Sequence, residues 1–305
     1  MKTKIKLFTH TDLDGVGCAV LTKHVFKSFL EIEFCGYHNV NEKITNFLNT
    51  ENLKNYSAVF ITDISVNLET AERIDKDYAD KFILLDHHKT AVWLNKYGWA
   101  LVKETEIKKA NGKEVATSGT SLLFSFLYEN GLIIGSKYRD FVEFTRLYDT
   151  WEWFPNKLEA KQLNDLYIIT GRQNFMTRFL QNPSICFSET EIKLLELEET
   201  RLNSYIRTKQ NELIKYQIDK FMVGVVFAER YQSEVGNSLS DNNRHLDFIV
   251  ILNPSKKQIS FRTTKENVNL SEISKRYGGG GHTKSAGCFM SENSILTFLE
   301  SLFKE

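Results

Sequence analysis

Three short apolar runs that each end in acidic or imidazole side chains are the feature that most constrains the fold of this 305-residue chain. They are residues 4–9, 58–62 and 82–85, followed by His10-Thr11-Asp12-Leu13-Asp14-Gly15, by Asp63 and by Asp86-His87-His88-Lys89. Short apolar runs are typical of buried parallel strands. Because ligands bind beyond the carboxyl ends of such strands, these polar residues are expected at one sheet edge, where they are placed for chemistry.

The polar residues at this edge indicate a metal site. Crowded carboxylates repel one another unless cations lie between them. Oxygen and imidazole donors without thiolates suit Mn²⁺ or a similar divalent ion better than a structural zinc. Two such ions side by side form a clamp for phosphoryl transfer. For Asp86-His87-His88 alone, a solvated turn after a strand is an equal alternative, so the prediction depends on all three strands ending in this way.

Strands and helices are expected to alternate through the first half of the chain. We expect strands at 4–9, 32–37, 58–62, 82–85 and 99–103, and helices after Gly15, at 42–49, 68–77 and 122–127. This order predicts an α/β domain with a doubly wound, mainly parallel sheet. Gly15 and Gly17 allow a tight turn and a close approach to a ligand, or are ordinary turn glycines. The Ser and Thr residues of 116–120 can cap a helix, with substrate contact as the alternative.

A long helix is expected to connect two domains. Ser188 and Glu191 form a capping box, and apolar residues at 195, 202, 206 and 213 then lie on one helical face. We therefore expect a catalytic domain at 1–185, a connecting helix at 186–218 and a smaller α/β domain at 219–305. Before the connection, residues 158–180 are predicted to be helical, and Asp149 follows residues 141–148 as an acid among aromatic residues. A buried carboxylate needs a partner, and the local sequence favours a salt bridge over a metal for Asp149.

The C-terminal part restarts the pattern of strands and helices around a run of four glycines. Strands are predicted at 221–228, 246–252 and 258–262, and helices at 234–242, 270–277 and 295–303. The run Gly278-Gly279-Gly280-Gly281-His282 is either a linker or a backbone nest for an anion, with His282 directed at the bound group. The small residues that follow at 285–287 favour substrate binding.

Composition narrows the possible partners. Lys plus Arg equals Asp plus Glu at 39 each, which argues for short substrates over a long tracked duplex. The four cysteines form no C-x-x-C pair, so neither a zinc site nor a disulfide framework is indicated, and three of them are expected in the core. Without an apolar stretch that could span a bilayer or a signal-peptide core, the protein is expected to be cytoplasmic, with no membrane partner.

Together these motifs resemble the DHH family of phosphoesterases, in the branch whose C-terminal domain carries a G-G-G-H-x-x-A-A-G sequence. The matching residues, in the family's order, are His10-x-Asp12-x-Asp14-Gly15, Asp63, Asp86-His87-His88, Asp149, and Gly279-Gly280-Gly281-His282 through Ala286-Gly287. The resemblance covers nearly the whole chain and is greatest to the NrnB-type oligoribonucleases.

This resemblance implies a site with two manganese ions between an N-terminal and a smaller C-terminal α/β domain, with Mg²⁺ or Co²⁺ as possible substitutes. It implies that His10 and Asp12 bind one ion, that Asp14, His87 and Asp149 bind the other, and that Asp63 bridges them. For Asp149 it reverses the salt-bridge prediction. Asp86 would orient a ligand.

The resemblance also implies residues that contact substrate. His88 would face the substrate phosphate, and Arg262 falls where the family has a substrate-binding arginine, whose planar fork suits a phosphate. His282 would help to neutralise the developing charge, beside Gly279, Gly280 and Gly281. Two positions depart from the common pattern: many relatives have H-x-x-x-D-x-D, which would place the histidine at Phe8, and Ser285 stands where the family usually has alanine.

The expected activity is manganese-dependent hydrolysis of short oligoribonucleotides to mononucleotides by a water activated between two metals. Alternatives are cyclic or linear dinucleotides or 3′-phosphoadenosine 5′-phosphate as substrates, and a catalytically idle nucleotide-binding regulator. The expected partner is a short single-stranded RNA or a dinucleotide, and a homodimer is possible because the long helix can pair with another chain.

Overall fold

The computed structural model describes residues 4–107 and 112–291 and divides into two compact units, Met1–Leu195 and Glu196–Glu305. The division falls inside helix α7 (Glu189–Asn211), whose Leu195 packs in the core of the first unit. Tyr205 and Ile206 of the same helix pack in the second unit. Among the described residues, no helix is both long enough and apolar enough to cross a bilayer.

The N-terminal unit is built on a five-stranded parallel sheet of order β2-β1-β3-β4-β5. Its strands are β1 (Lys4–Thr9), β2 (Leu30–Phe34), β3 (Tyr56–Thr62), β4 (Phe82–Asp86) and β5 (Ala100–Val102). Thr62 pairs with Thr9 on one side and with Leu85 on the other. This register aligns the ends of β1, β3 and β4, so the residues that follow them emerge together.

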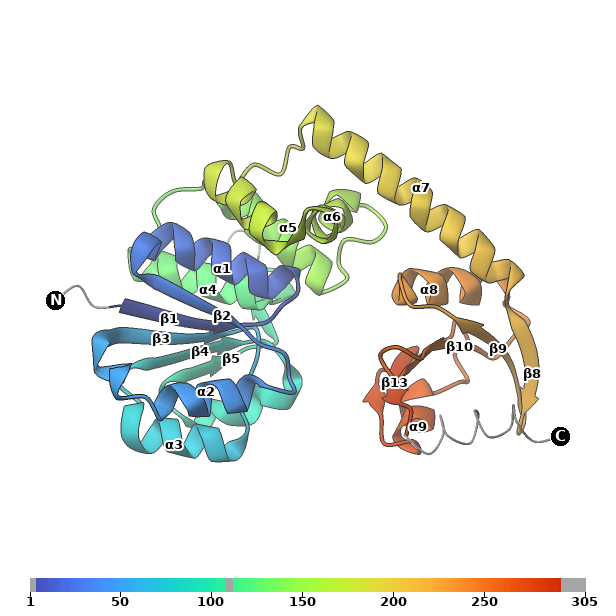
Figure 1. Cartoon of the computed structure of the whole chain (residues 1–305), viewed down its shortest axis with the longest axis horizontal. Helices are drawn as coiled ribbons and strands as arrows, with labels where there is room; N and C mark the ends of the chain where they lie inside the picture. Colours follow the sequence, from blue (N-terminus) through green and yellow to red (C-terminus); the bar gives the residue numbers. More distant parts are fainter. Residues whose placement is uncertain (1–3, 108–111, 292–305) are drawn as a thin grey trace. The chain divides into compact units, whose positions relative to one another are not determined.

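Helices cover both faces of this sheet, which confirms the predicted doubly wound fold. Figure 1 shows α1 (Leu13–Phe26) and α4 (Gly119–Glu129) on one face, and α2 (Val40–Leu48) and α3 (Leu68–Tyr78) on the other. Alternate residues of the strands face opposite sides, as pleating requires: Leu7 packs in the core beside α1, and Phe8 packs in the core beside α2.

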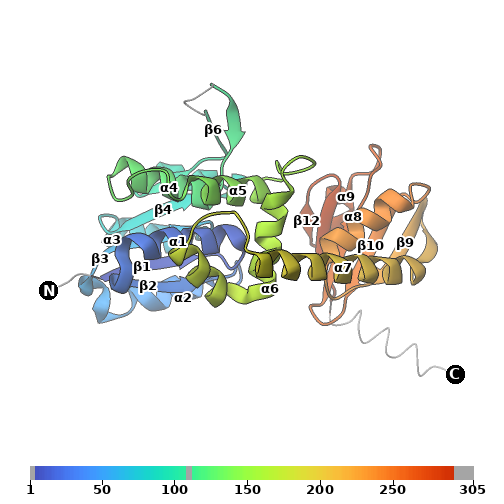
Figure 2. The same ribbon diagram turned by 90° about the horizontal axis from the view of Figure 1, so that it is seen from above.

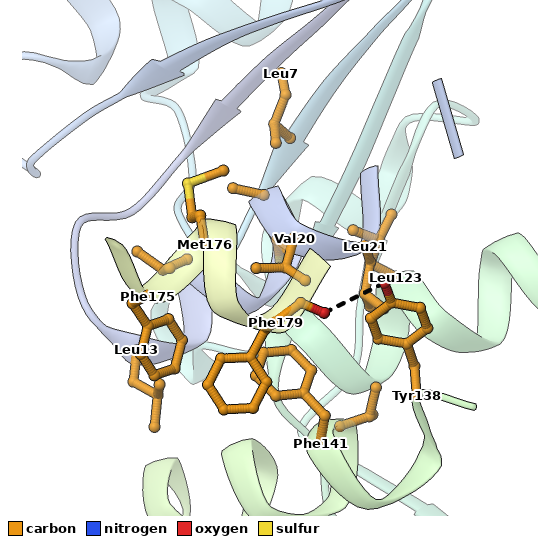
Figure 3. Close-up of a cluster of buried hydrophobic side chains, with 14 of the residues drawn as sticks. Leu7, Leu13, Val20, Leu21, Leu123, Tyr138, Phe141, Phe175, Met176 and Phe179 are labelled. Atoms are coloured by element: carbon orange, nitrogen blue, oxygen red, sulfur yellow. Dashed lines mark hydrogen bonds between the residues drawn. The ribbon is translucent and has the colours of Figure 1, made fainter. Parts of the chain in front are cut away.

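Two further helices, α5 (Arg139–Asp149) and α6 (Leu158–Gln181), pack against α1. The contact is a cluster of aromatic rings in which the centroid of Phe179 lies 4.6 Å from that of Phe141 and 4.5 Å from that of Phe175 (Figure 3). Leu13 and Val20 of α1 line the same cluster. Buried rings of this kind contribute strongly to packing, and here they fix α5, whose last residue is Asp149.

Sequence patterns missed a small hairpin in this unit, β6 (Thr105–Ile107) with β7 (Glu114–Ala116). Its strand β6 projects away from the rest of the N-terminal unit in Figure 2. The helix predicted at 158–180 is confirmed as α6, with a break at Gly171, where φ is 73°. The expected three core cysteines are Cys18, Cys35 and Cys288, and Cys186 is exposed.

The C-terminal unit is a mixed sheet of order β12-β13-β11-β10-β9-β8, in which only β9 and β10 run parallel. The strands are β8 (Ile214–Ile218), β9 (Phe221–Phe227), β10 (Phe248–Asn253), β11 (Gln258–Arg262), β12 (Gly280–Gly281) and β13 (Ser285–Phe289). Helices α8 (Gln232–Asn242) and α9 (Leu270–Lys275) cover opposite faces, because alternate residues of β10 pack in two separate clusters.

The connecting helix predicted over 186–218 is shorter than expected. Helix α7 ends at Asn211, and Ile214–Ile218 forms an edge strand instead. Ile214, Tyr216 and Ile218 alternate with polar residues, a period of two that suits a strand, and pairing with β9 overrides the helical spacing that Leu213 suggested. The helix predicted at 295–303 lies outside the described residues.

Candidate metal centre

The loop between β1 and α1 places His10 and Asp12 at the carboxyl edge of the sheet. Asp12 caps α1: one carboxylate oxygen accepts a hydrogen bond from the Gly15 N–H at 3.0 Å, and the other lies 2.7 Å from Nδ1 of His10. A Cβ on Gly15 would lie 2.3 Å from the carbonyl oxygen of His10. Gly15 is therefore required for this turn, which explains its place in the motif.

Asp14 lies in the first turn of α1 and is 1% exposed. Its carboxylate accepts hydrogen bonds from the backbone N–H groups of Gly119, at 2.5 Å, and Thr120, at 2.9 Å, which open α4. A helix N-terminus stabilises a carboxylate in this way. Ser118 caps the helix, as predicted, and the neighbouring amides hold Asp14. Sequence analysis missed this support, whose partners are 105 and 106 residues apart in the chain.

Asp63 follows β3 and has a left-handed backbone, with φ of 57°, which is uncommon for a residue other than glycine. It is 1% exposed, and its Oδ2 is buried without a hydrogen-bond partner. Burial, together with the nearby charges of Asp14 and Asp12, raises the pKa of Asp63 well above its usual range. A strained, buried and unpaired carboxylate is costly unless a ligand compensates it.

His87, which follows β4, lies among three carboxylates. Its Nε2 lies 3.4 Å from Oδ1 of Asp63, 3.5 Å from Oδ2 of Asp149 and 3.9 Å from Oδ2 of Asp14. This nitrogen is buried and has no hydrogen bond, and burial lowers the pKa of the imidazole. Burial and the charge of Asp14 raise the pKa of Asp149 to about 9.

The salt bridge first considered for Asp149 is not formed with a nearby arginine. Within the described part of the chain the ion pair recorded for Asp149 joins it to His87. Arg146, three residues earlier on α5, is bound by Glu143 and Glu152, each at 3.0 Å. Arg146 also donates to the carbonyl oxygen of Ala116 at 2.9 Å, so it links α5 to the chain that enters α4.

These residues fit a divalent cation. Their donor atoms converge in three overlapping sets, with the atoms of each set within 4.8 Å of one another: His10 with Asp12 and Asp63, Asp14 with His87 and Asp149, and Asp63 with Asp86, His87 and His88. Buried polar atoms normally have partners, yet Oδ2 of Asp63 and Nε2 of His87 have none. Carboxylate and imidazole donors suit a divalent ion such as Mn²⁺ or Mg²⁺, which would satisfy both atoms.

Asp86 and His88 stand on either side of His87 in the sequence, but their side chains are hydrogen-bonded, whereas the His87 ring nitrogen Nε2 is not. Oδ1 of Asp86 lies 2.7 Å from Nδ1 of His88 and accepts the backbone N–H of His87 at 2.8 Å, while the Ser65 hydroxyl donates to its Oδ2. Burial, the largest single effect, opposes both charges, but the mutual hydrogen bond and the attraction between opposite charges together outweigh it, so the pKa of Asp86 is lowered and that of His88 is raised. Asp86 therefore orients the turn through the backbone of His87 and the ring of His88.

Tyr37 completes this arrangement and was missed by sequence analysis. Its hydroxyl lies 3.1 Å from Nε2 of His88, and its ring lies 4.9 Å from that of His10, centroid to centroid. Both Tyr37 and Ser65 follow strands at the same sheet edge. Their position after these strands could have indicated that they lie near the site, but tyrosine and serine are not residue types that indicate a metal site.

In the C-terminal unit, Arg262 ends β11 and is partly buried. Its guanidinium donates to the carbonyl oxygen of Phe261 at 2.9 Å and to Oγ of Ser233 on α8 at 3.1 Å. A Cβ on Gly236 would lie 2.5 Å from Cγ of Arg262, so α8 approaches the arginine closely.

The glycine run forms the start of a tight hairpin. Gly280 and Gly281 pair with β13, and the His282 N–H donates to the Ser285 carbonyl oxygen at 2.7 Å. A Cβ on Gly279 would lie 2.2 Å from the Gly287 carbonyl oxygen, so a side chain does not fit there. The His282 side chain is exposed beside this turn. Close packing accounts for Gly279 and Gly281, which excludes a flexible linker.

Comparison with known proteins relates the whole chain to one curated enzyme. The chain is 38% identical over 307 aligned residues to oligoribonuclease NrnB of Bacillus subtilis (strain 168), and the match covers 98% of this chain and 76% of the relative. No protein-family model matches the chain.

Solved structures show the same fold at low sequence identity. Exonuclease RecJ bound to manganese matches with a TM-score of 0.59 and 13% identity over 97% of this chain and 88% of RecJ. The pGpG-specific phosphodiesterase PggH from Vibrio cholerae matches with a TM-score of 0.51 and 15% identity over 98% and 97% of the two chains. With these matches, the motif order and the converging donor set in agreement, the chain belongs to the family of oligoribonuclease NrnB, among the DHH phosphoesterases.

Proposed function

We propose that this protein is a manganese-dependent phosphodiesterase that hydrolyses short oligoribonucleotides to mononucleotides with water activated between two metal ions. The observation that carries the proposal is that two donor sets lie on either side of Asp63 at the carboxyl edge of a parallel sheet, with one Asp63 oxygen near His10 and the other near His87. The family supports phosphodiester hydrolysis, since the curated relative is named an oligoribonuclease. The manganese-bound RecJ structure, which has the same fold, supports the choice of metal.

In this proposal His10 and Asp12 hold one cation, Asp14, His87 and Asp149 hold the second, and Asp63 bridges them. Distances from Asp63 support the bridge: its two oxygens lie 3.9 Å from Nδ1 of His10 and 3.4 Å from Nε2 of His87. The cations, when bound, would lower the pKa of a water molecule and neutralise charge on the phosphate.

The remaining residues would bind and orient the substrate. Asp86 holds the His88 ring at Nδ1, so the Nε2 side of the ring, beside the Tyr37 hydroxyl, would face a phosphate oxygen. In the C-terminal unit, we propose that Arg262 and His282, beside Gly279, Gly280 and Gly281, contact the phosphate and stabilise the charge that develops on it. No protein nucleophile is required: a water oxygen would bond to phosphorus as the bond from phosphorus to one ribose oxygen breaks, the water proton would pass to solvent, and the departing ribose oxygen would take up a proton.

Linear dinucleotides are the second candidate substrate, because the pGpG-specific phosphodiesterase shares the fold. The test is a hydrolysis panel in Mn²⁺ with RNAs of two, three, five and about twenty nucleotides, a cyclic dinucleotide and 3′-phosphoadenosine 5′-phosphate. The Asp63→Asn variant is the matched inactive control. Fast loss of the two- to five-mers with a spared twenty-mer supports the proposal.

Other outcomes of the same panel would change the conclusion. Turnover of the dinucleotide alone would narrow the substrate to that class. Preference for the cyclic dinucleotide or the nucleoside bisphosphate would replace the substrate and keep the metal site. No turnover of any substrate in Mn²⁺, Mg²⁺ or Co²⁺ would contradict the enzyme and favour the idle nucleotide-binding regulator.

A further inference from the structure

Tyr37 lies at the tip of a short loop that is fixed at both ends. The Cys35 N–H donates to the Thr9 carbonyl oxygen at 2.8 Å, which ties the loop to β1. The Gly36 N–H donates to Oδ1 of Asn39 at 2.9 Å, and the Val40 N–H returns to the Gly36 carbonyl oxygen at 3.1 Å. Because this turn is closed by its own hydrogen bonds, the Tyr37 backbone is held in place before any ligand arrives.

The Tyr37 side chain is held as well. Its ring packs at 44° against the ring of His10 and edge-on, at 88°, to the ring of His88, and its hydroxyl lies 3.1 Å from Nε2 of His88. Tyr37 thus bridges the loops that follow β1 and β4. Despite these contacts the residue is 60% exposed.

An exposed aromatic ring held at a phosphate-binding edge has the properties of a stacking platform. To orient His88, a tyrosine needs only its hydroxyl beside Nε2. The solvent exposure of the Tyr37 ring is not explained by that role. Nucleobases stack on aromatic side chains whatever their sequence, and each such contact is worth about 1–3 kcal/mol. In a nucleotide the base is one sugar away from the phosphate, so a ring beside His88 is within reach of the base that flanks the bound phosphate.

We propose that Tyr37 is a stacking platform for a nucleobase that flanks the scissile phosphate. This inference rests on the proposed function, since it names a base-bearing substrate for the same site. Such a platform makes the site selective for nucleotides over other phosphodiesters. It does not distinguish one base from another, because stacking involves the face of the base, which all bases have, and not the hydrogen-bonding groups at its edge.

The test compares an unmodified dinucleotide with two analogues that carry an abasic ribose, one at the 5′ position and one at the 3′ position. The measured quantity is the ratio of kcat/KM for the unmodified dinucleotide to kcat/KM for the slower analogue. In the wild-type protein we expect a ratio of at least about 5, which corresponds to the lower limit of one stacked base. Tyr37→Ala should bring the ratio close to one, and Tyr37→Phe should keep the wild-type ratio.

A matched control comes from Tyr128, which is 48% exposed on α4 and whose recorded ring contacts are with Phe124 and Arg139. Tyr128→Ala should keep the wild-type ratio. A wild-type ratio of one, or an unchanged ratio in Tyr37→Ala, would overturn the platform. If Tyr37→Ala slowed all three substrates equally, Tyr37 would act only by holding His10 and His88. Failure of the wild type to hydrolyse the unmodified dinucleotide would instead contradict the proposed function.

A second measurement is independent of turnover. A dinucleotide analogue with a methylene bridge in place of the scissile oxygen and with 2-aminopurine bases is fluorescent, and stacking on a ring quenches it. Titration into the metal-loaded protein should quench the fluorescence for the wild type and for Tyr37→Phe. Binding to Tyr37→Ala without this quenching supports the platform, and equal quenching in all three proteins contradicts it.

Discussion

Two polar clusters lie side by side at the carboxyl edge of the N-terminal sheet, and they differ in how their charges are satisfied. The open cluster, Asp14, Asp63, His87 and Asp149, contains buried atoms without hydrogen bonds. The closed cluster, Tyr37, Ser65, Asp86 and His88, forms a continuous chain of hydrogen bonds. The consecutive residues Asp86, His87 and His88 are divided between the two, so their order in the sequence does not decide their roles.

The pKa shifts follow the same division. In the open cluster burial raises the pKa values of Asp63 and Asp149 and lowers that of His87, so each neutral form is favoured. In the closed cluster, hydrogen bonds and opposite charges together outweigh burial, so the pKa of Asp86 is lowered and that of His88 is raised. Asp63 and Asp149 therefore need a cation to be ionised, whereas Asp86 and His88 stabilise each other's charge.

The largest effect is expected when the open cluster loses its shared carboxylate. Asp63→Asn keeps a side chain that tolerates the left-handed backbone and removes the charge. We expect kcat/KM to fall at least about a thousandfold, because the metals contribute several kcal/mol to the transition state. Calorimetric titration should show that Mn²⁺ binding is weakened, while the metal-free melting temperature stays the same or rises. Near wild-type turnover would contradict a bridging role.

The closed cluster should be less sensitive. Asp86→Asn leaves the ligands in place but removes the negative charge that holds protonated His88, and it replaces one of the two oxygens that accept from Ser65, His87 and His88 with an NH2 donor. Residues that support ligands in this way typically contribute about 10–100-fold to metal affinity or activity. The same change should lower the pKa of His88, which NMR titration of the imidazole measures. A loss as large as that of Asp63→Asn would show that Asp86 binds the metal directly.

The stability of the metal-free protein should depend on pH through the open cluster. Asp149 has a pKa of about 9 in the fold, against about 4 for an unfolded aspartate, so between these values the folded state holds a proton that the unfolded state has lost. Raising the pH therefore favours unfolding, by up to about 1.4 kcal/mol per pH unit for one such group.

Melting temperatures in chelator from pH 6 to pH 9 measure this dependence, in a range where the neighbouring carboxylates of Asp12 and Asp86, whose pKa values are lowered, stay charged and where His88, whose pKa is raised, adds a loss of stability of the same sign. The stability should fall as the pH rises in chelator, and the slope should flatten with saturating Mn²⁺, because the cation keeps the carboxylates ionised. An equal slope with and without metal would place the proton uptake elsewhere in the protein.

The sequence predicts the open cluster well because a parallel sheet brings the ends of its strands to one edge. Apolar periodicity located β1 at residues 4–9 and β4 within one residue, and the residues after them had to emerge together. Asp149 was harder to assign, because its position depends on how the aromatic cluster of Phe141, Phe175 and Phe179 seats α5.

The rest of the site depends on contacts that no local pattern encodes. The amides of Gly119 and Thr120 reach Asp14 across more than one hundred residues of sequence. In the same way, the apolar spacing predicts a helix through residues 214–218, whereas pairing with β9 determines that they form strand β8.

The smallest effect is expected at Ser65, and it decides whether the closed cluster acts as a unit. The Ser65 hydroxyl donates to Oδ2 of Asp86, which is buried, so Ser65→Ala leaves that oxygen with one donor fewer. One such hydrogen bond is worth about 1 kcal/mol, so we expect a comparable loss in the free energy of unfolding and a fall in kcat/KM of less than about tenfold.

Ser57→Ala is the matched control, because Ser57 is an exposed residue on β3, the strand that precedes Ser65, and its hydroxyl makes a long 3.4 Å contact with the Lys4 carbonyl oxygen. It should change neither quantity. If Ser65→Ala lowers the pKa of His88 in the same direction as Asp86→Asn but by less, the hydrogen bonds act as one chain from Ser65 to Tyr37. If the pKa of His88 is unchanged while stability falls, Ser65 supports the fold alone, and the closed cluster reduces to the pair of Asp86 and His88.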